Sequence, residues 1–376
     1  MPLITSSRRV VPVARRQLAA QPAKLVASVL AVAAAVALVL LLAGLRRGVA
    51  EQATLYLDRQ PPVVVGQVGM RDFLSQASVL SERVGGTLER VRGVAEVEPV
   101  SQQFAMLRLH DKHVLTLLIG YDPGRGGGPW ALTRGREPRG RNEIVLDRVL
   151  ADEHGLEVGS LLAYRGAVLR VVGLSRGTSG FMTPLAFATR ATVNGLGGQA
   201  GTAGFFFVQP RAGITAAAIA ERIRATVPGV AVATRETIAA KDRQLFAAAF
   251  SGPLLAMVLI ALAAAALVVG LTVYGSTVER SREYATLKAL GLRLRGLAAL
   301  AGIQAGAIAT GGAGLGVALA IGGRAIAAQL APQYLIAFST GLALAVVAAA
   351  LVVALLAAAF PVRYLVRLDP AAAFRR

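Results

Sequence analysis

Long uncharged apolar runs are the feature that most constrains how this chain folds. Four runs contain no charged residue, and they cover residues 25–45, 244–278, 296–323 and 325–362. Each run can supply the roughly 20 apolar residues that cross a bilayer core of about 30 Å. Because 55% of the residues are hydrophobic and only 16% are charged, the composition also predicts an integral membrane protein.

Basic residues cluster at three places along the chain. They precede the first run (Arg8, Arg9), lie between the second and third runs (Arg280, Arg293), and follow the fourth (Arg363). By the positive-inside rule, both termini and the loop between the second and third runs are expected in the cytoplasm. The net charge of +19 is therefore explained by topology, and we expect no nucleic-acid partner.

These observations predict a membrane α-helical fold with four transmembrane helices and a large extracytoplasmic α+β domain inserted between helices 1 and 2. The first run is expected to be a retained anchor, because it is longer than the apolar region of a signal peptide. The predicted segments are a cytoplasmic or interfacial helix (1–24), transmembrane helix 1 (25–45), the extracytoplasmic domain with stalk helices (46–243), transmembrane helix 2 (244–278), a cytoplasmic helix (279–295), transmembrane helices 3 and 4 (296–323 and 333–362) and a cytoplasmic tail (363–376).

The sequence of residues 46–243 alternates between helical and strand patterns, as in a mixed α/β domain. A helix followed by a strand is predicted twice, over 80–100 and over 213–234, and the alternation over 104–122 predicts a hairpin. We therefore expect a duplicated α/β core with an inserted β module. Residues 46–58 and 235–243 continue the adjoining apolar runs with helical spacing. Such helices can carry mechanical displacement, which a flexible linker cannot.

Motifs for chemistry are missing from the chain. The sequence has no GxxxxGK[ST] phosphate-binding loop and no cysteine. The histidines are His110, His113 and His154, and the first two flank a predicted hairpin tip, where polar turn residues are a better interpretation than metal ligands. We expect no enzyme activity, no catalytic residue, and neither a cofactor nor a metal bound to this chain.

A short amphipathic helix is predicted in the cytoplasmic loop after the second run. Tyr284, Leu287 and Leu290 form one apolar stripe at helical spacing, and Gly291 is placed to end the helix. This stripe needs a groove to occupy, in a partner protein or among lipid headgroups. The polar residues of the same segment are Glu279, Arg280, Glu283 and Lys288.

Glycines recur in the third apolar run at the spacing of close helix contacts. Gly302 with Gly306, and Gly312 with Gly316, are two small-xxx-small pairs. Packing within the chain and contact between two copies are both open interpretations.

The segment 283–291, EYATLKALG, resembles a signature of ABC transporter permeases in the FtsX/MacB superfamily, and it is most similar to the DevC-like branch. Residues 142–162 and 367–374 also resemble family segments. The resemblance implies a MacB-like periplasmic core domain and identifies residues 279–291 as a coupling helix that docks into a separate ATPase.

The same resemblance implies partners and a location. It implies a multi-pass permease in the bacterial plasma membrane, a homodimer in contact with membrane lipids, and ATP and Mg bound by the partner ATPase. Relatives of the DevC-like branch also use a periplasmic adaptor. The expected function is export of an amphiphilic substrate such as a lipid, glycolipid, peptide or drug. The alternative is an FtsX-like mechanotransmitter that regulates a cell-wall hydrolase or senses an external ligand without transport.

Overall fold

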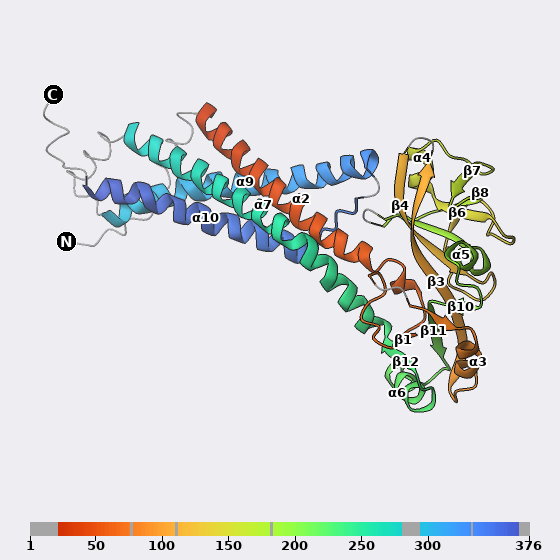
Figure 1. Cartoon of the computed structure of the whole chain (residues 1–376). Helices are drawn as coiled ribbons and strands as arrows, with labels where there is room; N and C mark the ends of the chain where they lie inside the picture. Colours follow the sequence, from red (N-terminus) through yellow and green to blue (C-terminus); the bar gives the residue numbers. More distant parts are fainter. Residues whose placement is uncertain are drawn as a thin grey trace, which may run out of the picture. The chain divides into compact units, whose positions relative to one another are not determined.

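The computed structural model describes residues 22–75, 78–109, 112–180, 183–279, 294–331 and 334–367. The chain divides into two compact units (Figure 1). Unit 1 comprises Met1–Arg47, Phe250–Leu330 and Ile336–Arg376, and unit 2 comprises Gly48–Ala249 and Ala331–Leu335.

Unit 1 is helical. Its helices belong to α2 (Pro22–Ala53), α7 (Arg235–Glu279), α9 (Leu294–Leu330) and α10 (Thr340–Arg367). Two segments in the described part of the chain are long and apolar enough to cross a membrane, Leu25–Ala53 and Ala305–Leu330, while Leu255–Val268 and Thr340–Val353 are shorter apolar stretches. Pro22 occupies the first position of α2, where a missing N–H costs the helix nothing.

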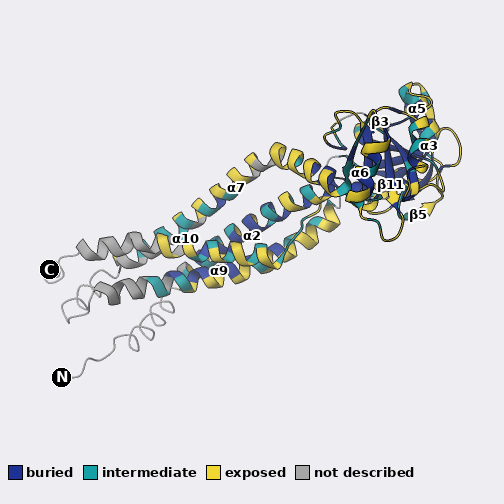
Figure 2. Ribbon diagram, turned by 90° about the horizontal axis from the view of Figure 1, so that it is seen from below, coloured by how far each residue is buried: buried dark blue, intermediate teal, exposed yellow. Residues whose placement is uncertain are grey.

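Unit 2 is built on a ten-stranded sheet with the order β12-β1-β11-β3-β4-β9-β6-β8-β5, and β7 pairs with both β3 and β8. Buried residues concentrate in this sheet (Figure 2). The strands are β1 (Val63–Gln67), β2 (Leu80–Ser81), β3 (Val94–Leu109), β4 (Lys112–Tyr121), β5 (Leu132–Gly135), β6 (Glu143–Asp147), β7 (Leu161–Tyr164), β8 (Ala167–Ser175), β9 (Leu185–Thr189), β10 (Thr202–Ala203), β11 (Phe205–Pro210) and β12 (Val230–Thr234). The helices are η1 (Leu57–Arg59), α3 (Arg83–Glu89), α4 (Arg148–Glu153), α5 (Arg190–Gly197) and α6 (Ala216–Thr226).

The predicted duplication is confirmed by the strand order. The units β1-α3-β3 and β11-α6-β12 interleave as β12-β1-β11-β3, and each neighbouring pair is antiparallel. This is the split β-α-β arrangement of ferredoxin-like folds. Both helices bury apolar side chains on one face of the sheet, with Leu88 of α3 and Ile219 and Ile223 of α6 fully enclosed.

The inserted β module is also confirmed, and β3 links it to the duplicated core. β3 pairs with β11 up to Val100 and with β4 from Val100 to Leu109. We expected two separate strands here, whereas the structure has one strand of 16 residues. The strand remains continuous because its partner changes at Val100 without any gap in the pairing. The segment after β4 is rich in glycine, proline and arginine, and β5 forms within it by pairing with β8.

Candidate functional site

The segment that directly follows α2 enters an aromatic core in unit 2. Tyr56 and Leu57 are 3% and 1% exposed, and the Tyr56 ring stacks on Phe73 with centroids 5.4 Å apart. The Tyr56 hydroxyl donates to the carbonyl oxygen of Gly127 at 2.8 Å. Burial raises the pKa of Tyr56 well above its ordinary value, so the hydroxyl stays a donor. The segment after α2 is therefore fixed by ring packing and one buried hydrogen bond.

The amino end of α7 enters the same core. Ile238 and Ala239 are buried in the cluster that holds Tyr56 and Phe73. Arg235, the first residue of α7, donates from Nη1 to the carbonyl oxygen of Gln60 at 2.7 Å, and its backbone N–H donates to Pro62 at 2.8 Å. The segment that follows α2 is thus bonded directly to the start of α7. We call this arrangement of Tyr56, Leu57, Phe73, Ile238 and Asp242 the stalk junction.

Asp242 is the charged member of the stalk junction. Its side chain is 0% exposed, and its Oδ1 accepts from the backbone N–H groups of Phe73 at 3.1 Å and Leu74 at 3.3 Å. Burial raises the pKa of Asp242 to about 7, and the neighbouring Asp72 adds to this shift. No hydrogen-bond donor in the described part of the chain reaches Oδ2. That oxygen is the natural place for the proton that the raised pKa favours.

The glycine-rich loop after β4 closes over the junction. Gly126 and Gly127 have φ values of 80° and 77°, in the left-handed region that side chains disfavour. A Cβ on Gly127 would lie 2.8 Å from Val100, so the close approach also requires glycine. Burial raises the pKa of Glu98, beside this loop, to about 7. The loop therefore supplies the backbone acceptor for Tyr56. Its glycines are explained by this close packing, without a bound nucleotide.

A buried polar network ties α2 to the β module. Asp147 is 1% exposed and accepts from Thr178 Oγ1 at 2.6 Å and from Ser179 Oγ at 2.7 Å. It also caps α4 by accepting from the N–H of Val149 at 2.9 Å. Gln52 of α2 donates to the carbonyl oxygen of Ser179 at 3.1 Å. Through this loop, α2 contacts the β module, while the segment after α2 contacts the aromatic core.

A cavity of about 480 Å³ opens beside Asp147. His154 contacts the carbonyl oxygen of Leu150 through Nδ1 at 3.1 Å. Across the described residues, no group of three or more His, Asp and Glu side chains has the arrangement of a metal site. The charged and histidine side chains that line the cavity are Lys112, His113, Asp147, Glu153 and His154.

The predicted coupling-helix residues lie outside the described side chains. Arg280, Glu283, Tyr284, Leu287, Lys288, Leu290 and Gly291 fall in the undescribed segment, and Glu279 is the last residue of α7. Their role therefore stays a prediction.

The four predicted packing glycines of α9 fall into two groups. A Cβ on Gly312 would lie 2.6 Å from Val32, and one on Gly316 would lie 2.7 Å from Val36, so both glycines face α2 at close range. Among the described residues, nothing lies within 4 Å of the corresponding position at Gly302 or Gly306. The two pairs therefore have different surroundings in unit 1.

Sequence reasoning missed the residues that form the stalk junction. Tyr56, Arg235 and Asp242 belong to no motif, and the partners of Asp242 lie 168 and 169 residues earlier in the chain. A weak signal was available, because an Asp on a helix face that also carries Ile238 and Ala239 is placed among apolar neighbours.

Two family models match the chain. The MacB-like periplasmic core domain matches residues 25–226, and the FtsX-like permease C-terminal domain matches residues 255–370. Uncharacterized ABC transporter permeases from two strains of Mycobacterium tuberculosis are 39% identical over 110 residues. The match covers 29% of this chain and spans only 30% of the length of each relative.

Solved structures with similarity to the chain include two external domains. The periplasmic region of MacB from Actinobacillus actinomycetemcomitans has 14% identity and a TM-score of 0.37, with coverage of 47% of this chain and 89% of that region. The extracellular domain of the noncanonic ABC-type transporter YknZ from Gram-positive bacteria also has 14% identity and a TM-score of 0.37, with coverage of 46% and 98%.

The family models and the apolar helices define a membrane permease with an extracytoplasmic domain. The chain belongs to the FtsX/MacB superfamily of ABC transporter permeases.

Proposed function

We propose that this chain is the permease subunit of an ABC exporter and transmits ATP-driven motion from a separate ATPase to unit 2. The observation that carries the proposal is that the segment directly after α2 and the start of α7 are buried in one core, around Tyr56, Phe73 and Ile238. Movement of either helix end must then displace packed side chains of unit 2, since protein interiors have few voids to absorb it. The exported substrate is an amphiphile.

The stalk junction suits this role because its contacts join the helices to different parts of unit 2. Asp242 of α7 holds the backbone of Phe73 and Leu74, which follows β1 in the duplicated core. Gln52 of α2 contacts the loop at Ser179, in the inserted β module. Unequal movement of the two helices would therefore strain the connection between the core and the module. We propose that the energy of ATP hydrolysis reaches the external domain as this strain.

The proposal includes a topology and a set of partners. Four helices cross the bacterial plasma membrane, both termini are cytoplasmic, and two copies pair as a homodimer within the lipid. ATP and Mg are bound by the ATPase, which docks on residues 279–291. A periplasmic adaptor completes the path. The charge distribution along the sequence supports this orientation.

Docking of the ATPase is tested by co-purifying the permease with its ATPase from one expression strain. Leu287→Asp places a carboxylate on the apolar stripe of the predicted coupling helix, and Tyr284→Ala removes an aromatic ring from the same stripe. We expect both variants to lose ATPase capture and the stimulation of ATP hydrolysis. Ala285→Asp is the matched control, because it adds the same charge on the opposite side of the predicted helix. Full capture and stimulation in both stripe variants would contradict the proposal.

Export itself requires a second readout. Proteoliposomes that contain the complete complex are expected to move a fluorescent lipid or hydrophobic drug only with ATP. If hydrolysis is coupled but no substrate moves, the transport part of the proposal is wrong while ATPase docking stands.

A further inference from the structure

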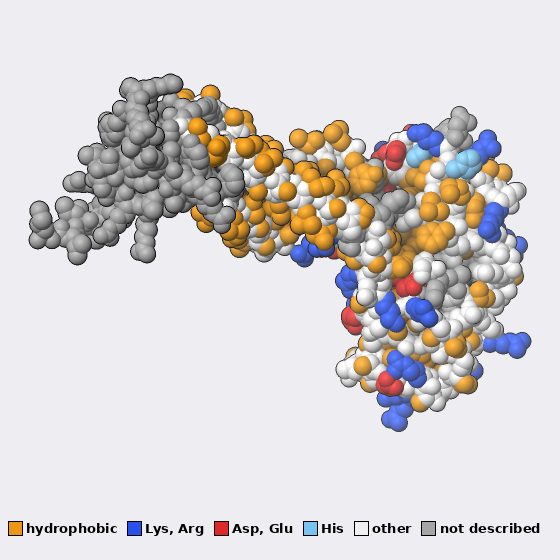
Figure 3. Space-filling view, turned by 60° about the vertical axis from the view of Figure 1, so that its left-hand side comes forward, with side chains coloured by type: hydrophobic (Ala, Val, Ile, Leu, Met, Phe, Trp, Pro, Cys, Tyr) orange, Lys and Arg blue, Asp and Glu red, His pale blue; other side chains and the backbone are white. Residues whose placement is uncertain are grey.

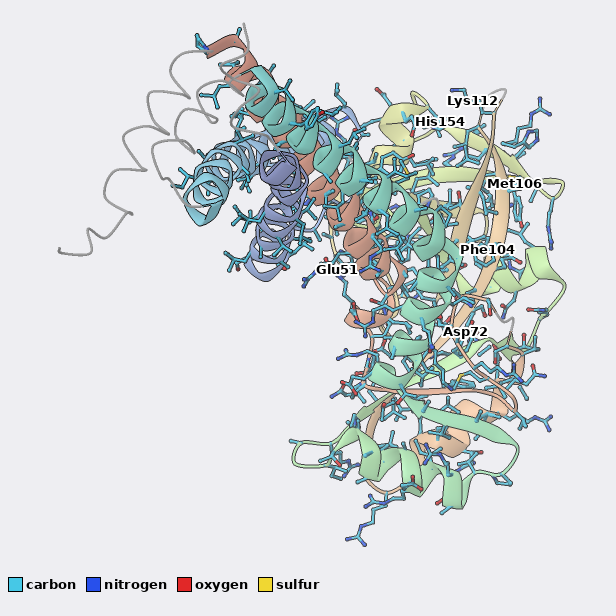
Figure 4. The ribbon with its side chains drawn as sticks, turned by 90° about the vertical axis from the view of Figure 1, so that its left-hand side faces the viewer. Glu51, Asp72, Phe104, Met106, Lys112 and His154 are labelled. Atoms are coloured by element: carbon cyan, nitrogen blue, oxygen red, sulfur yellow. The ribbon has the colours of Figure 1, made fainter. Side chains whose placement is uncertain are left out.

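One part of the large sheet in unit 2 leaves apolar side chains uncovered. On β3, Phe104 and Met106 are 46% and 51% exposed, and Leu115 of β4, directly opposite Met106, is 39% exposed. Val168 of β8 is 54% exposed. Figure 4 shows Phe104 and Met106 one after the other along β3. We call the surface formed by Phe104, Met106, Arg108, Leu115 and Val168 the open face.

Strand register makes the open face continuous. Arg108 of β3 is opposite Ala163 of β7, and Ala163 is opposite Val168 of β8. Successive outward residues on a strand are two positions apart, so Phe104, Met106 and Arg108 share one side of β3. The residues between them, Ala105 and Leu107, are fully buried on the other side.

The open face continues a buried one. Toward the stalk junction, the same side of the β3–β4 pair carries Val100 opposite Tyr121 and leads to Leu117 opposite Phe104. Val100, Tyr121 and Leu117 are at most 2% exposed and belong to the aromatic core. Antiparallel sheets that face water on one side normally carry polar residues there. The open face is instead an apolar surface without its cover, a feature that marks interaction sites.

The charged side chains on these strands indicate what kind of ligand the open face binds. From Gln102 along β3, and throughout β4, β7 and β8, the charged residues are Arg108, Lys112 and Arg170, and all three are basic. Arg108 and Arg170 lie on the open side, and their guanidinium groups have no hydrogen-bond or ion-pair partner among the described residues. Elsewhere in unit 2, Arg136 pairs with Glu143 and Arg190 pairs with Asp122. Figure 3 shows basic side chains interspersed with hydrophobic ones on the surface of this unit.

We infer that the open face binds an anionic amphiphile delivered from the membrane. Its hydrocarbon chain lies along Phe104, Met106 and Leu115, and its acidic group is held by Arg108 and Arg170. An ionised oxygen satisfies unpaired guanidinium donors with charge-assisted hydrogen bonds. This inference rests on the proposed export function and narrows its substrate class from amphiphiles in general to anionic amphiphiles.

A second copy of the chain fits the open face less well. In a two-fold contact the same patch would face itself, which brings the Arg108 side chains of the two copies together without an acid between them. The electrostatic repulsion would be strongest where the surface is driest. An acidic lipid-like molecule has no such conflict.

The test uses the full chain in discs of zwitterionic phosphatidylcholine, with dansyl-labelled undecanoate as the anionic probe and its methyl ester as the neutral one. Empty discs give the background. Binding is followed by the dansyl emission. The variants are Arg108→Gln with Arg170→Gln, which removes both charges, and Phe104→Ser with Met106→Gln, which removes the apolar strip. Arg134→Gln on β5 is the matched control, since Arg134 is also exposed and basic.

We expect the charge variant to weaken binding of the acid about tenfold and to leave the ester unchanged. The apolar variant is expected to weaken both probes by about tenfold or more. The inference is overturned if neither variant weakens the acid, or if Arg134→Gln weakens it equally. The inference is also overturned if the apolar variant leaves binding of both probes unchanged and alters only dimer formation or the capture of an acidic protein.

ATPase stimulation is measured on the same preparations. If the intact chain stimulates ATP hydrolysis but does not bind the anionic probe, the open-face site is refuted and the proposed function still stands. Loss of coupling in Leu287→Asp is independent of the open face, so the two hypotheses fail separately.

Discussion

Units 1 and 2 fill their cores with different side chains. The buried core of unit 1 consists of small and aliphatic residues, and Gly312 and Gly316 lie close to Val32 and Val36, with no room for a further methyl group. The junction core of unit 2 contains aromatic rings and a buried carboxylate, Asp242. One core depends on backbones that approach closely, and the other depends on large rings and on a buried carboxylate that accepts two backbone hydrogen bonds. Helix α2 contributes to the first core and the residues directly after it contribute to the second, so substitutions along this stretch separate the two kinds of packing.

Among the substitutions that separate the two cores, Tyr56→Ala is expected to lower the free energy of unfolding most. Removing a buried ring from the stalk junction costs about 3–5 kcal/mol in free energy of unfolding, because transfer and cavity terms add. Trp130 is the only tryptophan of the chain and packs beside Phe187 in the same core, so its fluorescence in a urea titration reports this loss. Tyr56→Phe is the control that keeps the ring and removes only the hydroxyl. A loss for Tyr56→Ala below that for Tyr56→Phe would contradict the ring-packing account.

Asp242 is expected to make the stability of unit 2 depend on pH. Its pKa is about 7 in the folded chain and about 3.9 in an unfolded one. The native state therefore keeps a proton that the unfolded state has lost, so the free energy of unfolding falls as pH rises from about 4 to about 7 and then levels off. The total change is up to about 4 kcal/mol. Asp242→Asn, which keeps an acceptor for Phe73 and Leu74, is expected to flatten this slope.

Urea titrations at pH 5 and pH 8 give the comparison. Because Glu98 has a raised pKa as well, the informative quantity is the difference between the intact chain and Asp242→Asn. Equal slopes for the two proteins would exclude a contribution from Asp242.

Gly312→Ala tests the close helix packing in the core of unit 1. The added methyl would lie 2.6 Å from Val32, and such overpacking costs about 1–3 kcal/mol. Gly302→Ala is the matched change, because no described residue lies within 4 Å of the added Cβ and alanine favours the helix by about 1 kcal/mol. Thermal unfolding in detergent, followed by helical circular dichroism, should show a lower midpoint for Gly312→Ala only. A lower midpoint for Gly302→Ala alone would reverse our assignment of the close contact.

Much of the fold followed from local pattern. The apolar spacing of the two helix-then-strand segments predicts the duplicated core, and alternation around residues 104–122 predicts the β3–β4 hairpin, because both signals lie within a few turns of chain. The continuity of β3 did not follow, since it depends on two partners, β11 and β4, that meet at Val100.

The candidate site was harder to predict than the fold. Asp242 sits in the segment ETIAAKDRQLF, where Lys241 and Arg243 give it the pattern of an exposed helix. Its burial is decided by Phe73 and Leu74, which approach only in the folded chain. The same holds for Tyr56, whose acceptor is the backbone of a distant loop.

The central claim is that ATP-driven motion reaches unit 2 through α2 and α7, and a distance measurement tests it most directly. The chain has no cysteine, so Arg176→Cys places one spin label on an exposed site of each copy. Label-to-label distances are recorded by pulsed electron paramagnetic resonance in the reconstituted complex, without nucleotide and with ATP trapped on the ATPase.

We predict that trapped ATP shifts the distance distribution in the otherwise intact chain. The shift should survive a Gly-Gly insertion in the exposed loop between Gly198 and Gln199. It should vanish when the same insertion lies between Glu51 and Gln52 of α2, with unit 2 still folded by Trp130 fluorescence. A shift of the same size in that α2 insertion, or no shift in the intact complex, would contradict transmission through the stalk junction.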